Sequence, residues 1–332
     1  MLKHKSLSKE VSIKFSVFMT VYVLIVVLFH SDLRYIYPFI EELTAISTSH
    51  FFCVSAFFFY RGLDNENIWK RLKKRCSTLL LPYLLWNLIY ILLYFRTHKF
   101  SLRSLFLGLT VNPLCTPSWY LMTLFIFLLL APLIKCALRK SYSTIFILGV
   151  CIAISYLGYI KFQQELATVP IVGGYLIRMA EYVTPYLIGG IIGTWFNNQI
   201  YVNCKTCLVG IISSCIFFLL LLSNISPELR WLLWVTLPLT LWMSIPEKIF
   251  GHLGFLHWLT EPAFLINMMH CYLLYMWQSL TTENGFISGK YLSVFNVLLA
   301  VVSSYVLHYL LKWFIPNMLK VLTGNRMQNQ TS

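Results

Sequence analysis

The sequence is short of charged residues, and of acidic residues above all. Only 11% of its 332 residues are charged, with 12 Asp and Glu against 26 Lys and Arg, while 58% are hydrophobic. Soluble domains carry about twice that fraction of charge. A water-soluble fold cannot bury so much apolar surface, so the composition excludes soluble classes and predicts a multi-pass membrane protein.

The sequence also lacks the alternation of apolar and polar residues that outer-membrane barrels show. Backbone groups inside a bilayer must be hydrogen-bonded within the protein, which leaves helices as the candidate spans. We therefore predict an all-α polytopic membrane protein. No cleavable signal is expected, because the first apolar run has about twenty residues and no small-residue cleavage site.

Cysteine pairs with metal or redox spacing are almost absent. Nine cysteines are scattered along the chain, mostly inside apolar runs, where a free thiol behaves as a small hydrophobe. Cys204 and Cys207 have suitable spacing but neither a second pair nor a nearby histidine. We therefore expect no metal.

Apolar runs of about twenty residues, the length of a bilayer-spanning helix, recur ten times. The runs lie near 11–30, 43–60, 78–96, 117–138, 142–160, 174–196, 203–224, 229–246, 260–280 and 291–315. No soluble stretch separates them. We expect one transmembrane domain over residues 1–332, with about ten transmembrane helices and cytoplasmic tails at 1–10 and 316–332.

The positive charges predict the orientation of these spans. The net charge of +14 does not indicate nucleic-acid binding, because Lys and Arg collect in short loops between apolar runs. With both termini in the cytoplasm, 18 of the 26 cations lie inside and 7 outside, and Arg178 lies within a span. We expect a protein of the cell (inner or plasma) membrane, in contact with lipid.

His30 ends the first apolar run, where a helix would return to water. On a helix it shares a stripe with Tyr22 and Val26, and Asp32 and Arg34 follow at once. An imidazole titrates near neutral pH and can act as a general base toward a hydroxyl. The alternative is an interfacial histidine that binds lipid headgroups or a loop, and position alone favours neither.

Three further ionisable residues fall inside predicted spans. Arg178 and Glu181 are three residues apart, so they can pair on one helical face. His270 lies in the middle of its run, one turn after Asn267. Charged and ionisable groups at that depth are costly and usually face the bundle interior. They either line a cavity or serve only helix packing.

A basic segment follows the second run. The predicted loop from Arg61 to Arg75 reads RGLDNENIWKRLKKR, with five cations in its last six residues. Such a cluster attracts anionic lipid. Alternatively it binds the phosphates of a cytosolic ligand, which clustered Lys and Arg do well.

Five stretches together carry a resemblance to a known family. They are VVLFHS, FFCVSAFFFYRG, KRLKKRCSTLLLPYLLWN, PSWYLMTLFIFLLLAPLI and FLINMMHCYLLYMW. In this order they resemble the integral-membrane acyltransferase-3 family, whose members O-acetylate surface polysaccharides, lipopolysaccharide and related glycans. The ten runs also match the number of spans typical of that family.

The resemblance implies transfer of an acyl group, usually acetyl, from cytosolic acyl-CoA (acetyl-CoA) to a hydroxyl of a glycan or lipid-linked saccharide. The family's essential first-helix histidine corresponds to His30. Its phosphate-binding basic patch corresponds to Arg71, Lys74 and Arg75. Met19 stands where the family often has an arginine.

The catalytic set expected from the residues and the resemblance together is His30, His270, Arg178 and Glu181. His30 would remove the acceptor's proton or briefly carry the acyl group, and the others would line the path. Two non-enzymatic alternatives are a transporter or flippase for a lipid-linked sugar and a partner subunit for polysaccharide export. The sequence does not define the oligomeric state.

Overall fold

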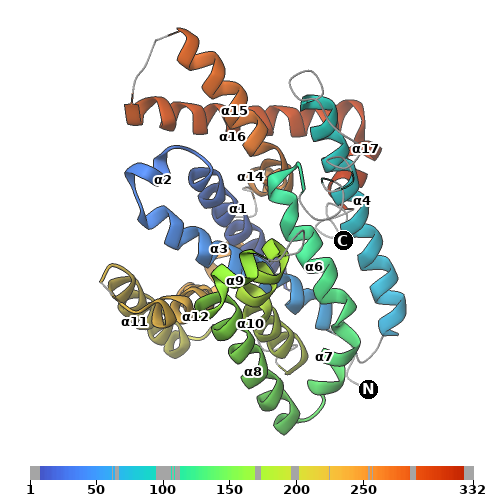
Figure 1. Cartoon of the computed structure of the whole chain (residues 1–332), viewed down its shortest axis with the longest axis vertical. Coiled ribbons are helices and arrows are strands. Elements are labelled where there is room, and N and C mark those ends of the chain that lie inside the picture. Colours follow the sequence, from blue (N-terminus) through green and yellow to red (C-terminus); the bar gives the residue numbers. More distant parts are fainter. Residues whose placement is uncertain are drawn as a thin grey trace. The chain divides into compact units, whose positions relative to one another are not determined.

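The computed structural model describes residues 8–61, 63, 67–94, 106, 108, 113–168, 173–195, 202–223, 225–252, 255, 257–284 and 289–324 (Figure 1). Within these ranges every regular element is helical. The predicted all-α class is therefore confirmed.

The helices follow the predicted apolar runs closely, since each of the ten runs is occupied by helix in the described ranges. They are α1 (Lys9–Phe29), α2 (Leu33–Ile36), α3 (Phe39–Tyr60), α4 (Ile68–Tyr94), η2 (Thr116–Ser118), α6 (Trp119–Leu129), α7 (Ala131–Ala137), α8 (Ser141–Ser155), η3 (Tyr156–Lys161), α9 (Gln163–Ala167), α10 (Gly173–Trp195), α11 (Cys204–Leu221), α12 (Pro227–Ser244), α13 (Glu247–Gly251), α14 (His257–Thr260), α15 (Ala263–Asn284), α16 (Gly289–Phe314) and α17 (Pro316–Leu322). Helix α17 lies within the predicted carboxyl-terminal tail.

Fewer helices than predicted are both long and apolar enough to cross a membrane. Six of the described helices meet both conditions, or seven if the bent pair α6 and α7 forms one span. The predicted number of about ten is thus too high by this measure. Helices α10, α12 and α15 have 23, 18 and 22 residues, so length is not what excludes them. Polar residues lower the hydropathy of α10 and α15, among them Arg178 and Glu181 in α10 and His270 in α15.

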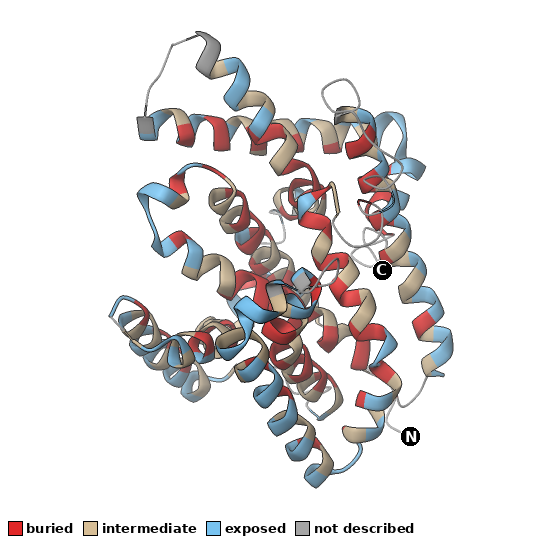
Figure 2. Cartoon of the chain, in the orientation of Figure 1, coloured by how far each residue is buried: buried red, intermediate tan, exposed pale blue. Residues whose placement is uncertain are grey.

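The spans differ in how much of their surface the protein covers. In α3, 72% of the apolar window is buried, against 17% in α8 and in α11 (Figure 2). Apolar side chains on α8 and α11 are exposed, among them Ile145, Phe146 and Leu219. An exposed apolar surface of this extent suits contact with lipid tails rather than water.

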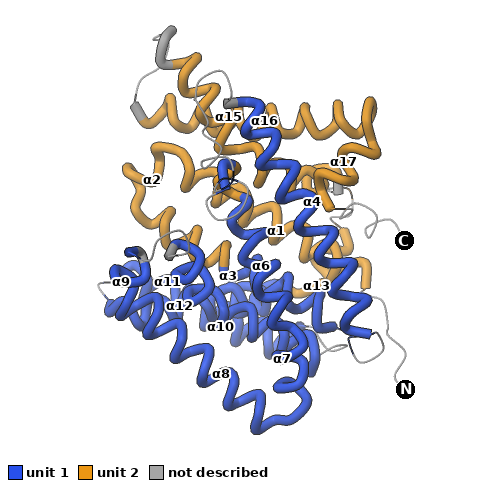
Figure 3. Tube along the Cα trace, turned by 45° about the vertical axis from the view of Figure 1, so that its right-hand side comes forward, with its two compact units in different colours: residues 1–6, 49–114, 118–245 blue, residues 7–48, 115–117, 246–332 orange. Residues whose placement is uncertain are grey.

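The described residues fall into two compact units, which Figure 3 distinguishes by colour. Unit 1 comprises the described residues within 49–114 and 118–245, and unit 2 those within 7–48, 115–117 and 246–332. The boundary between residues 48 and 49 falls inside α3.

In unit 1, helices α3 and α10 make a close approach that depends on glycine. A Cβ on Gly189 would lie 2.0 Å from the carbonyl oxygen of Cys53, and one on Gly193 would lie 2.6 Å from that of Phe57. Only glycine leaves room for the α3 backbone at these points. Small residues of this kind let two membrane helices approach each other closely.

The predicted fourth span is broken. Helices α6 and α7 are bent by 56° at Leu130, two residues before Pro132. Proline lacks the N–H that would continue the helical hydrogen bonds and its ring hinders the preceding turn, so a sharp bend is expected here. The run predicted over 117–138 is helical but not one straight rod.

Unit 2 is built around α1, which packs against α13, α14 and α15. Ser8 caps α1 by accepting a hydrogen bond from the Val11 amide. One turn further on, the fully buried ammonium of Lys14 lies 3.5 Å from a carboxylate oxygen of Glu247 in α13. Helices α15 and α16 pack together as a helical hairpin.

Candidate active site

Two histidines lie side by side in unit 2, one at the end of α1 and one within α15. The ring centres of His30 and His270 are 5.0 Å apart, and the ring planes are tilted by 49°. His270 is fully buried, whereas His30 is partly exposed. The structure therefore brings together two of the predicted site residues that are far apart in the sequence.

The end of α1 is held firmly against α15. The Ser31 hydroxyl donates to the Leu28 carbonyl at 2.6 Å and accepts from the Leu33 amide at 3.3 Å, which turns the chain out of the helix. The Asp32 carboxylate then accepts a hydrogen bond from Gln278 of α15 at 2.9 Å. These contacts position His30, the residue just before them, relative to the helix that carries His270.

The contacts of His270 define which ring nitrogen carries a proton. Its Nδ1 lies 3.1 Å from the Ile266 carbonyl oxygen, and its Nε2 lies 3.3 Å from the sulfur of Cys271. A carbonyl oxygen only accepts, so Nδ1 is the protonated nitrogen. In the neutral ring Nε2 then presents a lone pair, toward which the Cys271 thiol can donate.

This arrangement suits proton transfer to and from a hydroxyl. A histidine with a fixed tautomer presents a basic nitrogen in a defined direction. A partly exposed imidazole next to it can meet a substrate and exchange a proton with it. The site thus offers a reachable base, His30, supported by a buried second ring, His270.

Arg178 and Glu181 form the predicted pair, in α10 of unit 1. A terminal guanidinium nitrogen of Arg178 donates to the Glu181 carboxylate at 2.9 Å. Glu181 is buried with 5% of its side chain exposed, while 47% of the Arg178 side chain is exposed. The guanidinium also lies over the Trp119 ring, 4.9 Å from its centre. One face of this cation is therefore still accessible.

The basic cluster lies on a helix rather than in a loop, so that part of the prediction is wrong. Helix α4 begins at Ile68, and Arg71, Lys74 and Arg75 lie in its first two turns. Their spacing of three and four residues places them on one face. Arg71 donates to the Arg61 carbonyl at 2.8 Å, and Lys74 is exposed.

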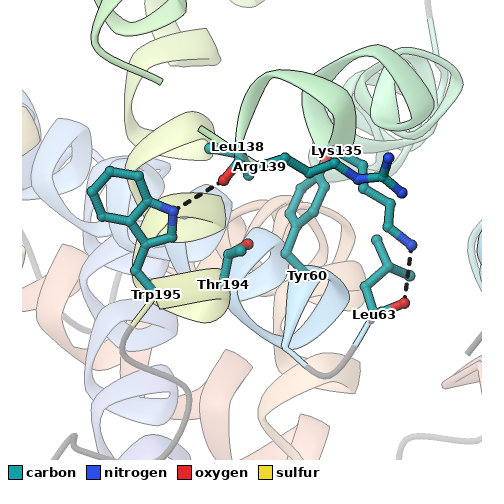
Figure 4. A pocket seen from close by; sticks show the side chains of 7 residues that line it. All are labelled: Tyr60, Leu63, Lys135, Leu138, Arg139, Thr194 and Trp195. Carbon is teal, nitrogen blue, oxygen red and sulfur yellow. Dashed lines mark hydrogen bonds between the residues drawn. The ribbon is translucent and has the colours of Figure 1, made fainter. Parts of the chain in front are cut away.

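A cavity of about 210 Å³ opens in unit 1 at the carboxyl ends of α3, α7 and α10. Figure 4 shows Lys135 and Arg139 on one side of it and Trp195 on the other. The Lys135 ammonium donates to the Leu63 carbonyl at 3.0 Å, and the Trp195 indole donates to the Leu138 carbonyl at 3.0 Å. Tyr60 and Thr194 complete the lining.

The cavity is linked to the basic cluster of α4 through two buried tyrosines. The rings of Tyr60, on the cavity wall, and Tyr186 meet edge to face with centres 6.2 Å apart. Arg75 lies close enough to Tyr186 to interact with it electrostatically. Cations from α4 and α7 therefore lie in the same region of unit 1.

Sequence reasoning missed three residues that the structure singles out. Cys271 was assigned with the other cysteines to the apolar core, although it directly follows His270. Lys135 and Arg139 were used only as topology signals. Their spacing of four residues before the fifth run was a usable sign of a second cationic face.

A helical membrane protein with a histidine pair and a cationic cavity has the parts of a group-transfer enzyme. The family model described as an acyltransferase domain matches residues 20–313, nearly the whole chain. The chain belongs to the acyltransferase-3 family. It is thus a membrane acyltransferase, which transfers groups other than aminoacyl groups. No curated protein and no solved structure matches it.

Proposed function

We propose that this acyltransferase moves an acyl group from cytosolic acyl-CoA to a hydroxyl of a surface or lipid-linked glycan in the cell membrane.

 The group transferred is acetyl. The observation that carries the proposal is the histidine pair, in which a partly exposed His30 lies 5.0 Å from the buried ring of His270.

The chemistry requires a base for the acceptor and a way to return the proton. His30 removes the proton from the acceptor hydroxyl as its oxygen attacks the thioester carbonyl. The bond between carbonyl carbon and sulfur breaks, and the protonated His30 gives its proton to the departing thiolate. His270, held by the Ile266 carbonyl, packs beside the His30 ring and limits the positions that this ring can take.

Arg178 and Glu181 are proposed to act on the substrates through charge. Since 47% of the Arg178 side chain is exposed, its guanidinium can donate hydrogen bonds to a polar or charged group of a substrate. Glu181 and the Trp119 ring fix the orientation of that guanidinium.

The donor's phosphates are proposed to bind the cationic region of unit 1. Arg71, Lys74 and Arg75 form one face of it, and Lys135 and Arg139 form the wall of the neighbouring cavity. Lys135 uses one hydrogen bond on the Leu63 carbonyl and retains two further donors for phosphate oxygens.

The experiment that tests the catalytic part is replacement of His30 in the full-length protein. Transfer of labelled acetyl from acetyl-CoA to cell-surface glycan would be followed by mass spectrometry. For His30→Ala we expect a loss of about 10²- to 10⁴-fold, the usual contribution of a general base. His252→Ala is the matched control, because His252 is exposed and lies outside the pair. Unchanged transfer by His30→Ala would end this assignment.

The donor part is tested separately by replacing Arg71, Lys74 and Arg75 together with Gln. We expect weaker binding of acetyl-CoA by the purified protein, measured directly, with the KM for the donor raised. Lys205→Gln is the control, since Lys205 is an exposed cation outside this region. Undiminished acetyl-CoA binding would contradict the assignment of these cations to the donor.

A further inference from the structure

Three atoms that bind soft and borderline metal ions converge at the histidine pair. A ring nitrogen of His30, a ring nitrogen of His270 and the sulfur of Cys271 all lie within 4.8 Å of one another. They come from two helices of unit 2, so the fold itself assembles the cluster.

One of the three distances between these atoms already matches that of a tetrahedral zinc site. Zinc bonds of about 2.0–2.1 Å to nitrogen and about 2.3 Å to sulfur place neighbouring ligand atoms about 3.3–3.6 Å apart. His270 Nε2 and Cys271 Sγ are already separated by 3.3 Å. His30 lies at the end of α1 and is partly exposed, so a small side-chain rotation can bring its nitrogen within the same range.

The surroundings also match those of a metal ligand. His270 donates from Nδ1 to the Ile266 carbonyl, which leaves Nε2 for the metal. A hydrogen bond of this kind from the second ring nitrogen is the usual support of a metal-binding histidine. Two imidazoles and one thiolate suit Zn²⁺ better than Mg²⁺ or Ca²⁺, which prefer oxygen ligands.

We propose that His30, His270 and Cys271 bind one Zn²⁺ and that the bound ion inhibits acyl transfer. Binding displaces the thiol proton of Cys271 to solvent and uses one lone pair from each ring. A zinc-bound His30 has no free lone pair with which to accept the proton of a hydroxyl. Metal binding stands on the geometry alone, whereas the inhibitory effect rests on the proposed role of His30.

The binding test uses the full-length protein in detergent, stripped of metal with a chelator and then given Zn²⁺ alone. Bound zinc is counted by elemental analysis after gel filtration, and Co²⁺ is added in a parallel sample to detect the thiolate by its charge-transfer absorption. We expect one Zn²⁺ per chain in the wild type. In Cys271→Ser and Cys271→Ala the affinity should fall at least tenfold and the Co²⁺–thiolate band should vanish.

The matched control replaces both Cys204 and Cys207 with Ser. This removes the pair of thiols with metal-like spacing and should leave zinc binding unchanged. Zinc binding that survives in both Cys271 variants, or that disappears in this control, would overturn the site. So would a wild-type protein that binds no zinc.

Inhibition is measured on the same samples as the ratio of transfer rates with and without Zn²⁺. A large drop in the wild type, relieved by Cys271→Ser, is the expected result. One bound Zn²⁺ with undiminished or increased transfer would overturn the inhibitory role while leaving the metal site intact. That result would also contradict the proposed role of His30 as the base.

Discussion

At the scale of single residues, the pair of Lys14 and Glu247 has the largest expected effect on stability. The Lys14 side chain is fully buried, and that of Glu247 is 7% exposed, at a separation of 3.5 Å. Removing one partner takes the nearest opposite charge away from a buried charge, and breaking a buried ion pair typically costs about 3–5 kcal/mol. We expect Lys14→Met to destabilise the folded protein by this order, measured as the fraction surviving a heating series in detergent.

Two comparisons make the result specific to the pair. Lys9→Met removes an exposed cation from the same helix and should change stability by less than about 0.5 kcal/mol. The double variant Lys14→Met, Glu247→Gln should recover part of the loss, because it removes both charges of the pair. If the stability lost in the double variant equals the sum of the losses in Lys14→Met and in Glu247→Gln, the pairing is contradicted.

A second residue-scale prediction concerns Glu261, in the turn between α14 and α15. The nearby His308 ring, 3.8 Å away, and the Lys312 ammonium, bonded at 2.7 and 2.8 Å, lower the pKa of Glu261 from 4.5 to about 2. A lowered pKa means that the folded state gains stability from the charged carboxylate. That stability is complete above pH 4.5 and is lost as the pH falls toward 2.

The corresponding measurement is thermal stability in detergent between pH 5 and 2. We expect the wild type to lose stability across this window, and Glu261→Gln to be less stable at pH 5 but to show a smaller decline. A Glu261→Gln variant with the same pH profile as the wild type would show that another group is responsible.

The site was predictable one residue at a time but not as a constellation. His30 stood out because it ends an apolar run, and His270 because a bilayer interior disfavours an imidazole. Their proximity depends on the packing of α1 against α15, which no local pattern encodes. Cys271 was not predicted as a site residue, because a free thiol within an apolar run behaves as a small hydrophobe and only its spatial neighbours distinguish it.

At the scale of the element, the contact between α3 and α10 is the most exacting in unit 1. A Cβ on Gly189 would lie 2.0 Å from the Cys53 carbonyl oxygen, so Gly189→Ala must push the helices apart. Overpacking of this kind costs about 1–3 kcal/mol. Gly174→Ala on the same helix is the control, because nothing lies within 4 Å of its added Cβ and alanine favours helix. Equal heat stability of the two variants would contradict the close approach.

Element positions were predicted well because the bilayer imposes length and composition on each run. Helix shape was predicted less well. The 56° bend between α6 and α7 and the π-helical turn at Tyr156–Lys161 depend on how neighbouring helices accommodate freed carbonyls. The basic cluster was predicted to be a loop because its charges end the apolar pattern. Helix α4 nevertheless extends beyond the apolar run and begins at Ile68.

At the scale of the whole molecule, each unit contains contacts that agree with the predicted alternation of spans. In unit 1, Trp195 at the end of α10 bonds to Leu138, just before α8. Helices α8 and α10 therefore carry the chain out and back, although only α8 is apolar enough to qualify as a span by composition. In unit 2, Glu261 before α15 bonds to Lys312 near the end of α16, as expected of two successive spans.

The bent pair α6 and α7 decides how the chain is threaded through the membrane. Between Tyr35 and Tyr142 lie α3, α4 and this pair. If the pair crosses the membrane, the chain makes three crossings between these residues, and they lie on opposite sides. If the pair re-enters on the side from which it came, there are two crossings, and the residues share a side.

Labelling from outside the cell separates these cases. Tyr35 and Tyr142 are 71% and 68% exposed, so a cysteine at either position is accessible to a membrane-impermeant maleimide. The excess of Lys and Arg on one side predicts that Tyr35 faces outward and Tyr142 the cytoplasm. We expect Tyr35→Cys to be labelled in intact cells above the wild-type background, and Tyr142→Cys only after permeabilisation. Labelling of both in intact cells would make α6 and α7 a re-entrant element, and the reverse pattern would invert the whole chain.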